Sequence, residues 1–295
     1  MKNILLIAFC LSTISSFAQD DLLDLLDEQT PQETYIVEAT FKGTRILNGH
    51  SVETRRKNNL DFLISHRFGK INGGAYQLFG LDQSNVRISF DYGVTDRFNI
   101  GIGRNSFEKT FDGYLKYRLL RQSSGAKAMP LSVTLFTSSS IKTLRDEVFK
   151  EVIDFNDKLA FTSQVLLARK INANISLQLM PTYVHFNTIR PEQKKNDIYA
   201  LGGGGRFKLS QRISVNAEYY HQFNRLVKGS KNAIGIGFDI ETGGHVFQLH
   251  FTNSQSMVEK GFIAEGRNDF FAGDIHFGFN ISRTFQLGGE AKKHI

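Results

Sequence analysis

The chain has 295 residues, of which 36 are Lys or Arg and 29 are Asp or Glu, giving a formal net charge of +7. Hydrophobic residues make up 41% and charged residues 22%, a balance that excludes a helical polytopic membrane protein. The single cysteine, Cys10, lies in the first apolar stretch, so a mature chain without that stretch has no disulfide scaffold, cysteine zinc site or thiol nucleophile. Phe and Gly are abundant at 26 each and Pro is scarce at 4, a composition that suits many strands joined by tight turns.

Residues 1–18 have the pattern of a cleaved secretory signal peptide. Lys2 gives a short basic region, residues 4–14 an apolar core, and Ala18 a small residue at the cleavage site. A lipoprotein cysteine at Cys10 is disfavoured, because the bulky Phe9 precedes it. No later stretch approaches the ~18 apolar residues of a spanning helix, so we expect an exported protein without a helical anchor.

Two segments precede the predicted strands. Residues 19–34 form an acidic amphipathic tether, with leucines at 22, 25 and 26 that fit a helical stripe. It is either a solvated tail or a segment that docks on a protein partner through residues 20–34. Residues 35–57 form an N-terminal segment, luminal or non-spanning. The part at 35–47 would be a thirteenth strand, whereas bacterial single-chain barrels have even strand counts. It therefore lies in the lumen, at the periplasmic mouth, or in a non-spanning strand.

From residue 58 onward the pattern alternates with a period of two. In residues 234–241, every even position is bulky and apolar, and every odd position is Gly or acidic. Such alternation is the signature of a strand. The pattern predicts an all-β fold with twelve strands, at 58–68, 85–93, 97–104, 111–120, 130–142, 158–169, 174–186, 198–209, 212–225, 232–241, 244–253 and 270–285.

Strand length and loop length favour a membrane-spanning antiparallel up-and-down β-barrel over residues 58–285. Several segments reach the ~9–11 residues of a tilted transmembrane strand, whereas strands of soluble proteins average 5 or 6. The connections alternate between short and long, as in outer-membrane barrels, although the connection at 121–129 is long for its side. A soluble exported β-sandwich is the structural alternative. Residues 286–295 form a C-terminal tail.

Several strings of this chain together resemble an uncharacterised family of Bacteroidota-type outer-membrane β-barrel proteins, a domain of unknown function. They are DDLLDLLDEQ, TFKGTRILNGHSVET, NLDFLISHRFGKINGGAYQLFGLDQ, FDYGVTDRFNIGIGRNSFEKTFDGYLKYRLLRQ, GFDIETGGHVFQLHFTNSQSM and GDIHFGFNISRTF. The resemblance implies an outer-membrane location and a single barrel, and it brings no reaction or catalytic residue with it. The end of the chain, from Phe277 to Phe285, is also similar to the terminal strand signal read by barrel-assembly machinery, which we expect as a partner.

The polar face of the strands predicts a charged lumen. The expected inward residues are Arg67, Arg87, Asp91, Asp112, Lys116, Arg118, Arg206, Lys208, Glu218, Asp239, Glu241, His250 and His276, with Asp61 as a further acidic member. Because an unpaired buried charge costs several kcal/mol, we expect these charges to pair across strands. A balanced, charge-laced lumen indicates a narrow or plugged interior. Gly202–Gly205 lacks the features of a phosphate loop and indicates close packing or room for an inserted segment.

Candidate chemistry is sparse, and we expect no enzyme, cofactor or metal. A lipid hydrolase would need a nucleophile beside a base, and the stretch from His250 to Ser254 has Thr252 where the nucleophilic serine would stand. The histidines 245, 250 and 276 could hold a metal only with a further ligand such as Asp274. No basic helix or stacking platform accompanies the positive charge, so nucleic acid is not an expected partner. The expected partners are membrane lipid and lipopolysaccharide, the latter bound through Arg55, Arg56, Lys57, Lys194 and Lys195.

Three functions remain open for a barrel expected in the outer membrane of a Gram-negative bacterium. The leading hypothesis is a narrow porin-like channel or transporter for a small solute, motivated by the polar inner face. The second is a non-conducting structural or assembly barrel that docks a periplasmic or membrane protein through its acidic N-terminal segment. A barrel-hosted lipid hydrolase is the third.

Overall fold

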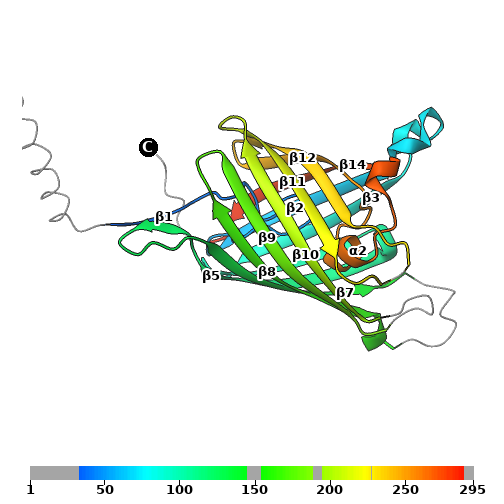
Figure 1. The fold of residues 1–295 in the computed structure, drawn as a ribbon, viewed down its shortest axis with the longest axis horizontal. Coiled ribbons are helices and arrows are strands. Elements are labelled where there is room, and N and C mark those ends of the chain that lie inside the picture. The colour runs from blue at the N-terminus through cyan, green and yellow to red at the C-terminus, as the bar shows by residue number, and fades with distance from the viewer. Residues whose placement is uncertain (1–32, 145–153, 189–194, 227, 289–295) are drawn as a thin grey trace, which may run out of the picture.

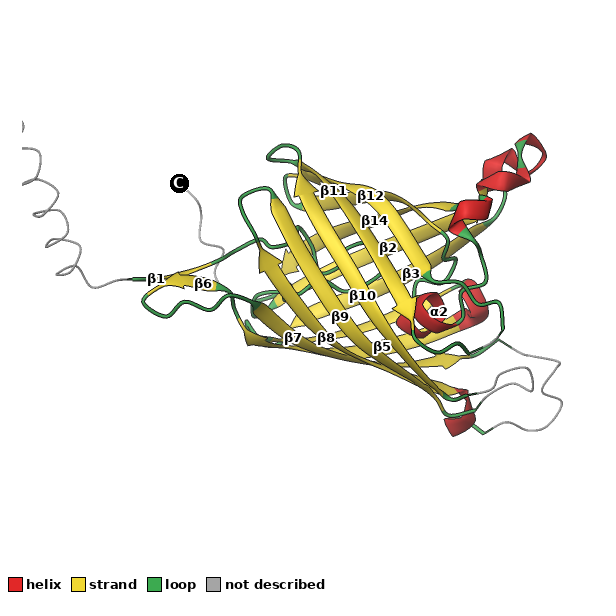
Figure 2. Cartoon of the chain, in the orientation of Figure 1, coloured by secondary structure: helices red, strands yellow, loops and turns green. Residues whose placement is uncertain are grey.

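Twelve antiparallel strands close into a barrel in the computed structural model, which describes residues 33–144, 154–188, 195–226 and 228–288 (Figures 1 and 2). Each strand pairs with the next along the chain, and the last pairs with the first to close the cylinder. The barrel strands are β2 (Asn59–Lys70), β3 (Ser84–Gly93), β4 (Phe98–Asn105), β5 (Thr110–Leu120), β7 (Ser132–Lys142), β8 (Leu159–Lys170), β9 (Ile175–Phe186), β10 (Asp197–Lys208), β11 (Ile213–Gln222), β12 (Ala233–Thr242), β13 (His245–Thr252) and β14 (His276–Gln286).

The up-and-down barrel predicted from the sequence is confirmed, and all twelve strands fall on the predicted segments. The largest boundary error is the last strand, which begins at residue 276 instead of 270. Residues 270–272 form the 3-10 helix η5 (Phe270–Ala272), because the Asp269 side chain accepts a hydrogen bond from the N–H of Phe271 at 3.0 Å. Gly273 then takes a left-handed conformation with φ of 84°, which ends the turn.

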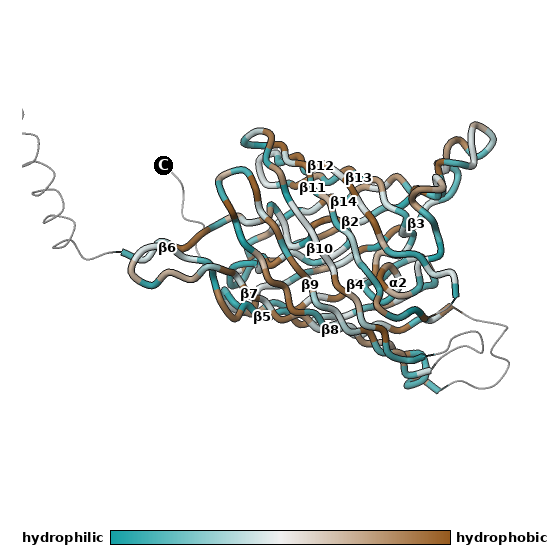
Figure 3. Tube along the Cα trace, in the orientation of Figure 1, coloured by the Kyte–Doolittle hydropathy of each residue, from teal (hydrophilic) through white to brown (hydrophobic). Residues whose placement is uncertain are grey.

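The barrel wall has an apolar outer face, which Figure 3 shows as brown segments along the strands. On β5, Leu115 is 49% exposed, whereas the next residue, Lys116, is 1% exposed. Exposed apolar side chains recur along other strands, as at Ile102 and Phe238. This arrangement, with large apolar groups outward and charged groups inward, is that of a barrel surrounded by lipid. The closed hydrogen-bonded ring of strands excludes the β-sandwich alternative.

The two ends of the barrel differ in their connections. At the short-turn end, the connections at residues 94–97, 171–174, 209–212 and 243–244 are tight, and the longer one at 121–131 contains β6 (Ser123–Gly125). This strand pairs with β1 (Thr34–Ile36), so the start of the described chain lies at the same end (Figure 1). The long-loop end carries the other connections, with η1 (Ile71–Gly73), η2 (Ala75–Gly80), η3 (Phe107–Lys109), η4 (Asn156–Lys158) and η5.

Two chain segments, one from each end of the barrel, fill its interior. Residues 40–53, called here the luminal segment, form a hairpin in which Ser51 N donates to Thr44 O at 2.9 Å and Ile46 N to Gly49 O at 2.8 Å. At the long-loop end, the short helix α2 (Glu259–Ala264) is buried along its whole length and packs against β8 and β11. Among the described residues, no helix is long and apolar enough to cross a membrane.

The predicted signal peptide, almost all of the acidic tether and most of the C-terminal tail lie outside the described residues. The segment at 35–57, for which the sequence left three positions open, begins with β1 outside the barrel and continues with the luminal segment inside it.

Candidate functional site

The tip of the luminal hairpin is held by one carboxylate of the barrel wall. Glu218, on β11, accepts three backbone hydrogen bonds, from the N–H groups of Leu47 at 3.3 Å, Asn48 at 2.8 Å and Gly49 at 3.1 Å. These are the N–H groups that a tight turn leaves without a partner within its own strands. Both Glu218 and the hairpin tip are buried, so this carboxylate and these donors satisfy one another away from water.

Other charged groups of the wall also bind the luminal segment. Lys116 Nζ donates to Glu53 O at 2.6 Å, and Arg118 Nη2 contacts Glu53 Oε2 at 2.8 Å. On another part of the wall, β10, Arg206 Nη1 donates to the carbonyls of Ala39 at 3.0 Å and Thr40 at 3.3 Å. These three wall charges therefore have their counterparts on the N-terminal chain inside the barrel, in an ion pair and in backbone hydrogen bonds.

Uncharged polar residues of the wall complete the binding of the segment. Gln178, on β9, accepts from Val52 N at 2.7 Å and donates to His50 O at 2.8 Å. Asn280, on β14, donates to Leu47 O at 2.9 Å. Because buried backbone groups are costly when unpaired, these side chains stabilise an irregular segment that has no sheet to join.

The segment also places apolar side chains into spaces that inward-facing glycines leave open. A Cβ atom added at Gly204 would lie 2.5 Å from Ile46 Cδ1, and one added at Gly235 would lie 3.2 Å from Leu47 Cδ1. His50 lies between two rings, with centroids 4.6 Å from Tyr114 and 4.2 Å from Phe136. Within the run of glycines at 202–205, Gly204 makes room for the inserted segment, whereas Gly202 packs closely against Tyr220 of the neighbouring strand, so both interpretations that the sequence offered hold in part.

The expectation that lumen charges pair with one another across strands is largely wrong. Among the predicted lumen residues in the described ranges, one such ion pair forms, in which Arg87 Nε and Nη2 bind the carboxylate of Asp112 at 3.0 and 2.5 Å. Arg87 reaches from β3 over the intervening β4, and a Cβ at Gly103 would lie 2.4 Å from its Nη2. The period of two predicts which charged side chains face the lumen. It does not predict that a hairpin lies in the lumen and binds them.

The structure places the other predicted lumen residues as follows. Arg67, Asp91, Asp239, His250 and His276 are buried, while Lys208 and Glu241 are half-buried near the short-turn end, where Glu241 pairs with Lys42 of the segment. Further contacts from this set join Arg67 to Asn48 Oδ1 at 2.8 Å, Asp91 to Thr44 Oγ1 at 3.2 Å, and Asp239 to the amide of Gln248 at 2.8 Å. Asp61 is also buried and pairs with Arg55 at 2.5 Å.

The three C-terminal histidines do not form one cluster. His245 lies at the short-turn end, whereas His276 lies near the long-loop end, where its ring contacts Asn268 and the Phe68 carbonyl at 2.9 and 2.8 Å. His250 is fully buried between them, and neither ring nitrogen has a hydrogen-bond partner in the described part of the chain. In the described part of the chain, His250 is therefore not hydrogen-bonded to a side chain that could serve as a nucleophile. No group of three or more potential metal ligands occurs within the described ranges either.

The basic run Arg55–Lys57 lies at the short-turn end, opposite to the end expected for a lipopolysaccharide contact. Lys57 N donates to the Asp96 carboxylate at 2.9 Å, in the tight connection between β3 and β4. Because this run follows directly on the luminal segment, its position is fixed by the return of the hairpin to the start of β2. Arg56 and Lys57 are exposed there, Lys195 is exposed at the long-loop end, and Lys194 lies outside the described residues. The contact with lipopolysaccharide stays a prediction.

An ion pair between Arg45 and Glu259 joins the two chain segments that fill the lumen. Arg45 Nη1, on the luminal segment, contacts Glu259 Oε1, on α2, at 2.8 Å, and also donates to Asn48 O at 2.9 Å. Both side chains are almost fully buried. The hairpin from the short-turn end and the helix from the long-loop end therefore meet inside the barrel.

Four residues that bind or belong to the lumen-filling segments were not predicted from the sequence: Glu53, Gln178, Asn280 and Glu259. Gln178 and Asn280 stand on the inward phase of their strands, so the alternation that located the charges also contained them. Glu53 and Glu259 lie in segments without periodicity, and their inward position follows only from the closure of the barrel around those segments.

Similar solved structures include the NanC porin, with a TM-score of 0.49 and 9% identity over 77% of this chain and 100% of that chain. Another is the COG4313 outer membrane channel from Pseudomonas putida F1, with a TM-score of 0.48 and 10% identity over 79% of this chain and 97% of that chain. No curated protein matches the chain. Residues 41–285 match the family described as Membrane bound beta barrel domain (DUF5777), and the chain belongs to this family.

Proposed function

We propose that this protein is a narrow channel for a small solute in the outer membrane of a Gram-negative bacterium, and that its luminal segment closes the channel. In this proposal the short-turn end faces the periplasm and the long-loop end faces outward, following the usual asymmetry of such barrels. The predicted signal peptide at residues 1–18 is consistent with export to that membrane.

The observation that carries the proposal is the chemistry of the wall behind the segment. Glu218, Lys116 and Arg206 bind backbone atoms of the hairpin, so the wall is charged where it meets the segment. If the segment leaves, water can take over these hydrogen bonds, whereas an apolar wall would collapse or stay dry. A lumen of twelve strands is also wider than that of an eight-stranded barrel, in which side chains alone fill the interior.

The proposal is tested by planar-bilayer conductance of the refolded chain from residue 19 onward. Residues 44–51, the hairpin arms and tip, are replaced by an equal number of Gly and Ser residues. We expect the native chain to be closed most of the time and the variant to give steady ohmic steps. A matched control replaces residues 75–80, in the loop outside the barrel, in the same way and should leave the conductance unchanged.

Two results would contradict the proposal. The first is a hairpin variant that is correctly folded and heat-modifiable but passes no current, because the lumen would then not conduct even without the segment. Native protein that conducts as well as the variant would show that the segment does not close the channel.

A non-conducting barrel remains the second candidate, because the segment also packs apolar side chains into the interior. Phe41, Ile46, Leu47 and Val52 are all nearly fully buried, as in a permanent core. In this case the acidic residues 20–34 would dock a protein partner. Deleting residues 20–34 and finding the same co-purifying proteins would count against docking.

A further inference from the structure

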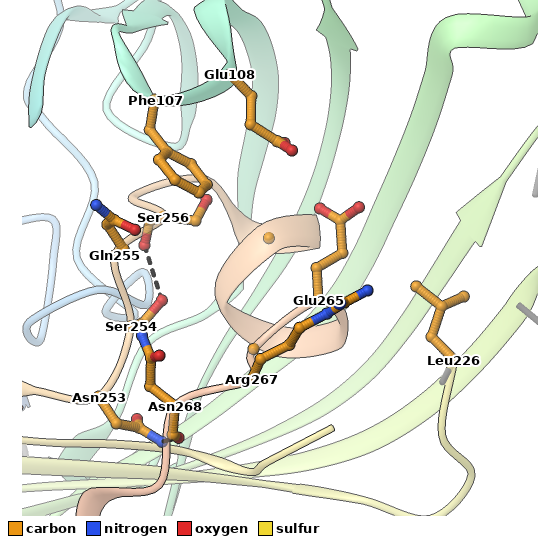
Figure 4. Close-up of a pocket in the computed structure, with 12 residues that line it drawn as sticks. Phe107, Glu108, Leu226, Asn253, Ser254, Gln255, Ser256, Glu265, Arg267 and Asn268 are labelled. Carbon is orange, nitrogen blue, oxygen red and sulfur yellow. Dashed lines mark hydrogen bonds between the residues drawn. The ribbon is translucent and has the colours of Figure 1, made fainter. Parts of the chain in front are cut away.

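A polar cavity lies at the long-loop end, beside the buried helix α2. Its volume is about 290 Å³, close to the lower end of the roughly 300–1,000 Å³ typical of small-molecule sites. Figure 4 shows residues from three parts of the chain around it. They include Phe107 and Glu108 from η3, Ser254 and Gln255 from the connection after β13, and Glu265 and Arg267 from the end of α2 and beyond.

The lining offers hydrogen-bonding groups of every kind. Arg267 forms no ion pair or hydrogen bond with the rest of the described chain, and the side-chain amide of Gln255 is likewise not engaged there. Glu108 and Glu265 add carboxylates. Lys142 Nζ lies 2.8 Å from the Glu108 carboxylate, and Lys260 Nζ lies 3.7 Å from the Glu265 carboxylate. Phe107 adds an aromatic ring to this polar lining.

This combination fits a small polyhydroxylated ligand. A hydroxyl group both donates and accepts, so one sugar ring can use the guanidinium and amide as donors and the carboxylates and serine hydroxyls as acceptors. The planar polar groups bind adjacent hydroxyls in pairs, and the C–H face of a sugar can pack on the Phe107 ring. Near-balanced charge in the lining favours a neutral ligand over a strongly anionic or cationic one.

We propose that this cavity binds a neutral sugar of one or two rings, and that its occupancy is transmitted to the luminal segment through α2. The second part rests on the proposed function, because the sugar would be the solute that opens the channel. Gly261 and Glu265 of the cavity lie on or next to α2, whose first residue, Glu259, contacts Arg45 of the segment.

The contact between the helix and the segment is well suited to transmit a small movement. Within the described structure, Arg45 uses one nitrogen, Nη1, for its contacts, while its Nε and Nη2 have no hydrogen-bond partner. The Nη1–Oε1 distance is 2.8 Å, so a shift of α2 by about 1 Å would take the pair out of hydrogen-bond range. A ligand wedged between η3 and α2 would favour such a shift.

Binding is tested by saturation-transfer NMR and calorimetry with glucose, maltose and cellobiose, using glycine and glutamate as zwitterionic and acidic comparators. We expect saturable binding of at least one sugar, weakened tenfold or more in Arg267→Ala and in Gln255→Ala. Arg225→Ala, which removes an exposed arginine outside the cavity lining at the same end, should bind as the native chain does. Absence of sugar binding, binding of the amino acids alone, or sugar binding that neither variant weakens would overturn the assignment.

Transmission is tested in the same samples by amide hydrogen exchange at Leu47, Asn48 and Gly49. We expect the bound sugar to speed their exchange about tenfold in the native chain, and to leave it unchanged in Glu259→Gln, which still binds the sugar. Sugar binding without a change in native exchange would overturn the transmission. Neither readout uses current, so a sugar site in a barrel that never conducts is distinguishable from a channel without a sugar site.

Discussion

The carboxylate of Glu218 is expected to decide how often the luminal segment is docked. It accepts three backbone hydrogen bonds from the hairpin tip, at 2.8, 3.1 and 3.3 Å, in a fully enclosed position. In Glu218→Gln the volume is kept, but the amide nitrogen cannot accept a hydrogen bond. With the amide oxygen in the position of Oε2, which accepts from Leu47 and Gly49, the bond from Asn48 is lost and the other two go to a neutral acceptor. Hydrogen bonds to a charged group contribute roughly 1.5–3 kcal/mol each, so we expect docking to weaken by ~3 kcal/mol or more.

This change in free energy has a direct consequence for the current. Every 1.4 kcal/mol is a factor of ten, so a loss of ~3 kcal/mol raises the ratio of undocked to docked segment roughly 100-fold. Single-channel recordings of the Glu218→Gln variant should therefore show openings far more often than recordings of the native chain. Amide exchange at residues 47–49 should accelerate by a comparable factor.

Asp112→Asn provides a matched control for this prediction. It also removes one buried carboxylate charge, but its partner is Arg87 of the wall and not the luminal segment. We expect it to lower the thermal stability of the barrel without raising the frequency of openings. Equal current in the two variants, or unchanged current and exchange in Glu218→Gln, would refute the reasoning.

Three further predictions concern packing, charge and pH. Gly204→Val should weaken the docking of the segment by roughly 1–3 kcal/mol through overpacking, because its Cβ would meet Ile46 Cδ1 at 2.5 Å. Gly203→Val should have no such effect, because a Cβ at Gly203 has no atom within 4 Å. Amide exchange of the hairpin distinguishes the two variants, and equal effects would contradict the packing argument. The opened channel should be weakly selective, because acidic and basic wall residues are near balance, so a reversal potential close to that of an ideally selective pore in a salt gradient would contradict this view. In the loop before β14, hydrogen bonding to Lys70 lowers the pKa of Asp274 to about 2. The contribution of this contact to stability is therefore present above the usual carboxyl pKa of 3.8 and is lost as the pH falls through about 2. A carboxyl titration by NMR with a midpoint at or above 3.8 would refute this prediction.

The sequence contained nearly the whole barrel, because the wall follows a simple physical rule. Lipid on one side and a polar interior on the other force a period of two on every strand, as in Leu115 and Lys116 on β5. The exception at residue 270 arises because Phe270 and Phe271 continue an apolar pattern that a local Asp269 turn overrides.

The candidate site was predictable only in part, since its centre is an irregular hairpin. Thr40 to Glu53 have no periodic signal, and their contacts come from strands far away in sequence, such as Gln178 on β9 and Asn280 on β14. Strand parity pointed to a non-spanning segment here, but parity contains no information on which wall charges it meets. That is why the charges of Glu218 and Arg206 were expected to pair with other strands, whereas they bind backbone atoms of the segment.

The most direct test of the account fixes the segment to the wall reversibly. Ile46 Cγ2, one bond from Cβ, lies 3.6 Å from the position of a Cβ at Gly204. The Cβ atoms of cysteines at positions 46 and 204 would therefore lie within about 5 Å of each other, and a small backbone shift brings them into the roughly 3.5–4.5 Å range of a disulfide. In the chain from residue 19, which lacks Cys10, these are the only thiols. Conductance is measured for this pair combined with Glu218→Gln, first oxidised and then after addition of a reductant. The account predicts silence when the bridge is formed and current when it is reduced; current that is the same in both states, or absent from both, would contradict it.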